Sequence, residues 1–126
     1  MKTTPDALAA LIGQRVDLID TPALVVDLDA MHRNIQRMAD FARKHQVRWR
    51  PHAKMHKSAE LALLLQQAGA QGVCVQKVSE AEALAAGGVL DITITNEVIA
   101  MPKLHRAARL ATALASRGGR LGVAVD

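Results

Sequence analysis

The sequence predicts an α/β fold in which parallel strands alternate with helices, as in the first part of a (β/α)8 barrel. The chain has 126 residues, of which 50% are hydrophobic and 22% charged, and this composition is typical of a globular protein with one core. Short β-branched runs alternate with longer segments of helical periodicity. About five strands are predicted, at residues 23–27, 47–50, 72–75, 91–95 and 121–125.

Four to five helices are predicted around these strands. A leading helix is expected over residues 5–15, with Thr4 as its N-cap and Pro5 at its first position. Apolar residues at helical spacing predict a second helix from residue 29 to about residue 45, with Asp29 as its cap.

The remaining helices are delimited by start and stop signals. They are expected over residues 58–68 before Gly69, from Ser79 to Gly87 and Gly88, and from Pro102 to Gly118 and Gly119. Ser79 and Glu82 match the Ser-x-x-Glu capping box. This pattern favours Ser79 as a helix cap over Ser79 as a nucleophile.

The domain organisation predicted is a helical lead-in over residues 1–19 and the N-terminal part of a barrel over residues 20–126. A (β/α)8 barrel usually needs about 250 residues, twice what this chain supplies. One residue follows the last predicted strand. We therefore expect a truncated barrel, because an open half-barrel leaves strand edges unpaired.

Composition argues against several functional classes. The net charge is +4 and the pI about 9.7, but the basic residues are scattered, and Phe41 and Trp49 are the sole aromatic residues, so nucleic-acid binding is not expected. No apolar run approaches a membrane span, and the N-terminus lacks a signal-peptide core, which predicts a cytoplasmic protein. Cys74 is the single cysteine, which excludes an internal disulfide, and its β-branched surroundings predict a core position.

The loop after the second predicted strand stands out chemically. Active sites of parallel β/α folds lie at the carboxyl ends of the strands, and residues 50–57, RPHAKMHK, crowd cationic and imidazole side chains there. Repulsion between cations and loss of water both lower a lysine's pKa. A lysine must be neutral to attack an aldehyde, and the same positive field suits a phosphate or carboxylate. The alternative is a solvated basic loop.

Other sites are less well supported. His52 and His56 are four residues apart, as in helical zinc pairs, but a proline precedes them and no third ligand is near, so no metal site is predicted. The chain contains no Gly-x-Gly-x-x-Gly, P-loop or Gly-x-Ser-x-Gly motif. Polar residues also follow the third and fourth strands, among them Gln76 and Asn96.

Four blocks of the sequence resemble one known family, that of D-threonine aldolase and D-serine dehydratase. They are DTPALVVDLD at residues 20–29, RPHAKMHKS at 50–58, QKVSEA at 76–81 and TNEV at 95–98. The second block is similar to that family's lysine loop for pyridoxal 5'-phosphate (PLP). Because the four blocks occur in register, the chain is identified as the N-terminal portion of a member of this family of alanine-racemase-like, fold-type III PLP enzymes.

The resemblance implies an alanine-racemase-like barrel completed by a C-terminal β-domain. It implies that Lys54 holds PLP covalently, with Lys57 as the competing lysine. Further cofactor-binding candidates are His52, Gln76 and Asn96. A divalent metal (Mn, Mg or Zn) is expected only in the full-length protein, because the family's metal ligands come from the C-terminal domain.

The activity implied by the resemblance is that of a PLP-dependent lyase that cleaves a small D-β-hydroxy amino acid to glycine and an aldehyde. Met55 favours an aldolase, and His56 is a candidate for proton transfer, with a structural role as its alternative. The alternatives for the chain are a D-serine or 3-hydroxyaspartate dehydratase, a non-catalytic PLP-binding barrel for cofactor homeostasis, and an inert fragment. The full-length protein is expected to be a monomer or homodimer.

Overall fold

The computed structural model describes residues 9–126. The chain divides into two compact units, of which the first ends at Met31 and the second comprises His32–Asp126. Within the described residues, no helix combines the length and the apolar character that crossing a membrane requires.

The first unit differs from the predictions made for it. Of the helix predicted over residues 5–15, with Thr4 as its cap and Pro5 at its first position, residues 5–8 lie outside the described residues, and in the described part residues 10–13 form turns. A short 3-10 helix, η1, follows at Val16–Leu18. The strand predicted over residues 23–27 is wrong: the segment has no strand partner among the described residues, and Leu24 is 82% exposed. A β-branched run becomes a strand only where a neighbour accepts its backbone hydrogen bonds.

Helix α2, Leu28–Lys44, begins one residue before the predicted position. The carboxylate of Asp27 accepts a hydrogen bond from the backbone N–H of Ala30 at 2.9 Å, so Asp27 is the cap. Asp29, the predicted cap, lies in the first turn, where its charge still complements the helix dipole.

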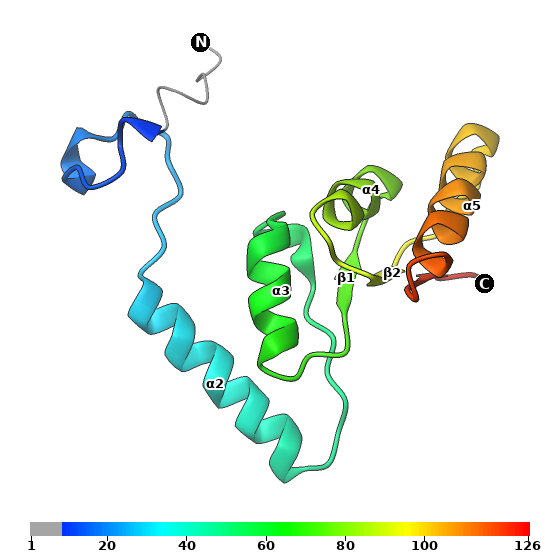
Figure 1. Cartoon of the computed structure of the whole chain (residues 1–126), viewed down its shortest axis with the longest axis horizontal. Helices are drawn as coiled ribbons and strands as arrows, with labels where there is room; N and C mark the ends of the chain where they lie inside the picture. Colours follow the sequence, from blue (N-terminus) through cyan, green and yellow to red (C-terminus); the bar gives the residue numbers. More distant parts are fainter. Residues whose placement is uncertain (1–8) are drawn as a thin grey trace. The chain divides into compact units, whose positions relative to one another are not determined.

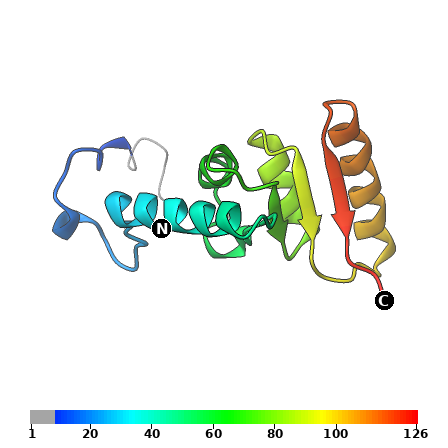
Figure 2. The same ribbon diagram turned by 90° about the horizontal axis from the view of Figure 1, so that it is seen from below.

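The second unit contains a parallel sheet of three strands in the order β1-β2-β3 (Figures 1 and 2). Its strands are β1, Val73–Val75, β2, Asp91–Ile94, and β3, Arg120–Val123. The helices that alternate with them are α3, Ala59–Gln67, α4, Val78–Ala86, and α5, Met101–Ala115. The predicted class, a partial barrel of alternating strands and helices, is confirmed, with three regular strands within residues 9–126 in place of the five predicted.

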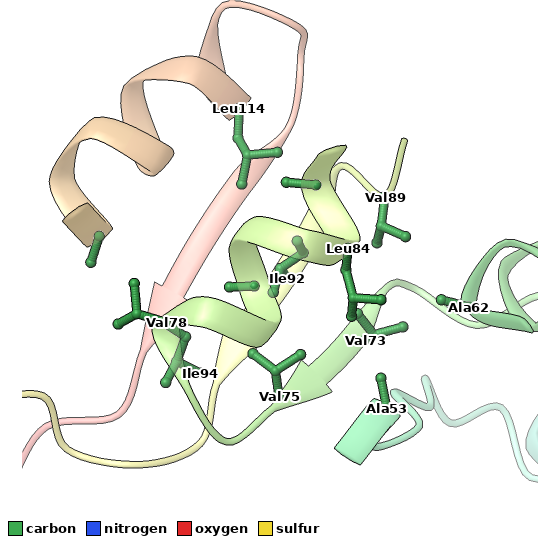
Figure 3. Packing of buried hydrophobic residues seen from close by; sticks show 13 residues of the cluster. Ala53, Ala62, Val73, Val75, Val78, Leu84, Val89, Ile92, Ile94 and Leu114 are labelled. Atoms are coloured by element: carbon green, nitrogen blue, oxygen red, sulfur yellow. The ribbon is translucent and has the colours of Figure 1, made fainter. Parts of the chain in front are cut away.

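The core lies between the sheet and its helices (Figure 3). Alternate strand residues point into it, and the buried side chains shared by strands and helices include Val73, Val75, Ile92, Ile94, Val78, Leu84 and Leu114. The intervening residues Cys74, Thr93 and Gly122 are paired in register as one row on the other face. Cys74 is therefore half-buried on the face away from the helices, and its predicted core position is wrong.

The second predicted strand, residues 47–50, forms an extended segment but no regular strand. It meets β1 through two backbone bonds, from Gln71 N to Trp49 O at 3.1 Å and from Cys74 N to Pro51 O at 2.8 Å. A single parallel bridge joins His52 to Cys74. Pro51 has no N–H to donate, which interrupts the ladder at this point.

Candidate functional site

The carboxyl ends of the strands bring three segments to one edge of the sheet. Gln76 follows β1, and Thr95 and Asn96 follow β2. The bridge at His52 leads directly into the 3-10 helix η2, Ala53–Met55, which carries Lys54. Because all pairings are parallel, Lys54 lies at the carboxyl edge, where the sequence predicted the site.

Short-range contacts fix the turn that presents Lys54. The ring of His52 caps η2, because its Nδ1 accepts the backbone N–H of Lys54 at 3.2 Å. Ala53 is 2% exposed and packs in the core, which anchors the turn to the sheet. The carbonyl of Ala53 accepts the N–H of Lys57 at 2.7 Å. The side chain of Lys54 is left exposed beside this anchored backbone.

The two lysines of the loop differ in their electrostatic partners. Lys57 Nζ lies 3.5 Å from Oε1 of Glu80. Among residues 9–126, Lys54 makes no ion pair. The Lys57 amine is thus engaged with a carboxylate, whereas the amine of Lys54 is exposed and available to an incoming aldehyde. The geometry therefore favours Lys54 as the nucleophilic amine of the loop.

Glu80 also organises the start of α4. Its Oε2 accepts the backbone N–H groups of Gln76 at 2.9 Å and Lys77 at 3.2 Å. Burial pushes the pKa of the Glu80 carboxyl upward, but these two donors and Lys57 outweigh it, so the pKa lies below its ordinary value. The predicted capping box of Ser79 and Glu82 is wrong, because α4 begins at Val78 and places Ser79 inside its first turn.

His52 belongs to a defined chain of hydrogen bonds. Its Nε2 lies 3.0 Å from Oγ1 of Thr95, and that hydroxyl donates to the carbonyl of Val75 at 3.2 Å. The threonine was not among the predicted site residues. The sequence signal for it was weak, since a threonine at the end of a strand is common.

The ring of His56 is held by a hydrogen bond from the backbone of Ser58. Its Nδ1 accepts the backbone N–H of Ser58 at 3.1 Å, and its Nε2 is buried with no partner among the described residues. Burial lowers the pKa of His56, against a smaller opposing effect of the bond from Ser58. Because Ser58 also caps α3, by accepting the N–H of Leu61 at 3.2 Å, His56 supports the connection between η2 and α3.

Gln76 and Asn96 line a hollow of 330 Å³ beside the starts of α4 and α5. Three cationic side chains, Lys77, Lys103 and Arg106, share it, and Arg106 is ion-paired with Glu82. His52, Lys54 and His56 are not part of its lining. The predicted site residues therefore fall into two groups at the same edge of the sheet, one around Lys54 and one around this hollow.

Arg50, which sequence order placed in the same loop, lies at the opposite edge. It pairs with Asp91, the first residue of β2, at 2.7 Å, and Arg120, the first residue of β3, pairs with the other carboxylate oxygen at 2.8 Å. This cluster joins residues 41 and 29 positions apart, so no local pattern could have predicted it. Within residues 9–126, no group of three or more His, Cys, Asp or Glu side chains is arranged to hold a metal ion.

Comparison with known proteins identifies a matching family and several relatives. A family model described as alanine racemase, N-terminal domain, matches residues 26–117. The 3-hydroxy-D-aspartate aldolase of Paracoccus denitrificans is 50% identical over 104 residues, which is 82% of this chain and 27% of that protein.

Two solved structures are similar in fold as well. The crystal structure of D-threonine aldolase from Filomicrobium marinum has a TM-score of 0.79 and 49% identity, covering 86% of this chain and 28% of its own. D-threo-3-hydroxyaspartate dehydratase from Delftia sp. HT23 has a TM-score of 0.69 and 42% identity, covering 86% and 27%. The chain thus spans between a quarter and a third of the length of these relatives. The resemblance predicted from the four sequence blocks is confirmed, and the chain belongs to the family of alanine racemase N-terminal domains.

Proposed function

We propose that this chain supplies the cofactor-binding lysine of a PLP-dependent lyase that acts on small D-β-hydroxy amino acids. The observation that carries the proposal is the difference between the two lysines of the loop. Lys57 is held by Glu80, whereas Lys54 follows the anchored Ala53 at the carboxyl edge and has no ion pair among the described residues. The relatives, two named as aldolases and one as a dehydratase, support a lyase.

The residues present fit PLP in their chemistry. An amine that is not committed to a carboxylate suits an aldehyde group, and the loop's positive charge suits a phosphate. Lys54 would hold the cofactor, and Gln76 and Asn96, whose amides lie at the same edge, would contact the cofactor or the substrate. When bound, PLP withdraws electrons from the substrate's α-carbon.

The chain's own residues position and shape this site. His52 caps the turn of Lys54, and His56 fixes the turn's exit toward α3. For His56 this geometry favours the structural role over proton transfer. A divalent metal, if the complete protein uses one, would act as a Lewis acid on the substrate's β-oxygen, with ligands outside the residues described here.

We favour an aldolase, in which the Cα–Cβ bond breaks to give glycine and an aldehyde. In a dehydratase, the α-proton and the β-hydroxyl leave instead, and the products are a 2-oxo acid and ammonia. The two relatives named as aldolases support this choice, and the third keeps the dehydratase as the second candidate. Product analysis on the complete protein with D-threonine and 3-hydroxy-D-aspartate separates the two.

The lysine assignment is tested by reductive labelling. The chain is incubated with PLP, reduced with borohydride and mapped by peptide mass spectrometry. We expect the pyridoxyl label on Lys54, lost in Lys54→Arg and retained in Lys57→Arg, which is the matched control in the same loop. Circular dichroism of each variant shows whether the fold is kept.

Two results would contradict the proposal. One is a label that stays in Lys54→Arg and disappears in Lys57→Arg. The other is a folded parent chain in which Lys54 carries no more label than exposed lysines outside the loop, such as Lys44.

A further inference from the structure

A continuous chain of hydrogen bonds links Thr95, at the end of β2, to the backbone of Lys54. Thr95 Oγ1 donates its one proton to the carbonyl of Val75, so toward His52 it can act only as an acceptor. His52 Nδ1 accepts the N–H of Lys54 and therefore carries no proton. The ring proton then lies on Nε2, which is 3.0 Å from Thr95 Oγ1 and donates to it.

Each hydrogen bond in this chain restricts the conformation of the turn that carries Lys54. The hydroxyl of Thr95 selects the tautomer and the ring orientation of His52, and the oriented Nδ1 caps η2 at Lys54. Thr95 lies 41 residues after Lys54 and does not share its loop, so the contact ties two strand ends together. The core fixes Ala53, and the bond from the N–H of Lys57 to the Ala53 carbonyl closes the turn, while the N–H of Lys54 has His52 as its partner.

We propose that Thr95 is a positioning residue for Lys54, and that it acts through His52. Its hydroxyl holds the imidazole that caps η2, so that the backbone of Lys54 keeps one conformation at the carboxyl edge of the sheet. The hydrogen-bond chain stands on its own, whereas its value for cofactor attachment rests on the proposed function.

The test compares Thr95→Val with Thr95→Ser in the full chain. Valine has the shape of threonine without its hydroxyl, and serine keeps the hydroxyl. Because Thr95 is exposed, neither change opens a cavity in the core. The first readout is amide hydrogen exchange at Lys54 by NMR. We expect exchange about fivefold faster in Thr95→Val, the size of one lost hydrogen bond, with the parent rate restored in Thr95→Ser.

The ¹⁵N shifts of the His52 ring provide a second readout, assigned by their loss in His52→Asn. We expect the parent ring to carry its proton on Nε2. Exchange at core amides such as Val75 and Ile92 should be the same in all variants, which shows that the fold is kept. A third readout is the rate of PLP labelling at Lys54, expected to fall in Thr95→Val and to recover in Thr95→Ser.

The readouts separate this proposal from the proposed function. The positioning role is overturned if amide exchange at Lys54 is unchanged in Thr95→Val, or if the His52 ring of the parent carries its proton on Nδ1. Either result counts whether or not PLP labels Lys54. If the parent labels at Lys54 and Thr95→Val labels at the same rate, the positioning role is also overturned. If the parent shows no label at Lys54 but the exchange differs as expected, the proposed function fails and the hydrogen-bond chain stands.

Discussion

Asp91 is the centre of charge at the amino edge of the sheet, opposite the candidate site. Arg50 and Arg120 each bind one of its carboxylate oxygens, and Arg50 passes directly over Gly72. A Cβ on Gly72 would overlap the carbonyl oxygen of Asp91 and lie 2.5 Å from Nη1 of Arg50. Glycine is therefore required there for the close approach, and the cluster ties the segment before Pro51 to β2 and β3.

The contribution of this ionic cluster to stability can be tested by comparing the parent with Asp91→Asn at several pH values. Burial raises the pKa of the Asp91 carboxyl, but hydrogen bonds from Arg50 and Arg120 outweigh it, so the folded-state pKa lies below the ordinary 3.8. A lowered carboxyl pKa stabilises the fold above the unfolded pKa, and this contribution is lost as the pH falls from 3.8 through the lowered value. We expect Asp91→Asn to reduce the free energy of unfolding by about 1–2 kcal/mol at pH 7.

Urea unfolding of both proteins between pH 7 and pH 3 provides the measurement. The difference between parent and Asp91→Asn should shrink as the pH approaches 3, because protonation removes the same charge from the parent. A difference that is constant over this range would show that the carboxylate charge contributes nothing.

At the scale of single residues, the sequence predicted where Lys54 lies in the fold better than it predicted the contacts around it. The RPHAKMHK loop indicated Lys54 because cations cluster there, and the structure places Lys54 at the carboxyl edge. The partner that distinguishes Lys57 from Lys54 is Glu80, 23 positions further along the chain, and no spacing rule connects them. Arg50 was predicted at the carboxyl edge because residues 50–57 were treated as one loop. In the structure Pro51 separates Arg50, at the amino edge, from the rest of that segment.

At the scale of elements, helices were predicted more reliably than strands, for a physical reason. A helix satisfies its own backbone hydrogen bonds, so periodicity and stop signals locate α2, α3, α4 and α5 to within a few residues, although the predicted caps of α2 and α4 were wrong. A strand depends on a partner, which a local run cannot specify. Residues 23–27 contain two valines, as β1 does, yet the described chain gives them no strand partner.

Two substitutions at the start of α4 test whether Glu80, and not Glu82, caps this helix. Glu80 is 13% exposed and accepts two backbone N–H groups, whereas Glu82, the acid of the predicted capping box, pairs with Arg106 near the surface. We expect Glu80→Ala to lower the free energy of unfolding by about 1–2 kcal/mol, because two donors lose their acceptor. Glu82→Ala is the matched control and should cost under about 0.5 kcal/mol, as exposed ion pairs do.

Urea denaturation at pH 7 followed by circular dichroism measures both variants. Since the pKa of Glu80 is lowered, its contribution is present above the ordinary glutamate pKa of 4.5 and is lost as the pH falls below it. The effect of Glu80→Ala should therefore be smaller at pH 3 than at pH 7. A larger loss for Glu82→Ala than for Glu80→Ala would contradict the revised cap and favour the capping box predicted from the sequence.

At the scale of the whole molecule, the two faces of the sheet differ in chemistry. The face toward the helices is a dry aliphatic core, and the opposite face carries Cys74, Thr93 and Gly122 in one row, with the ionic cluster at one edge and the His52–Thr95 pair at the other. β3 pairs only with β2 among the described residues. Lys54 therefore lies at the carboxyl edge of a sheet whose second face is only partly covered in the described chain.

This openness predicts that the 126-residue chain alone does not turn over D-threonine, even with PLP and a divalent metal added. Catalysis on an electron-withdrawing cofactor depends on fixed contacts to the substrate and on exclusion of water, and here the side chain of Lys54 is exposed. Cofactor attachment is less demanding, because it needs the positioned amine of Lys54 but no closed substrate pocket. The chain should therefore take up the pyridoxyl label at Lys54 and yet release acetaldehyde no faster than the Lys54→Arg variant. A coupled alcohol dehydrogenase assay measures this release. Turnover in the parent above that of Lys54→Arg would show that these strands suffice to build a working site.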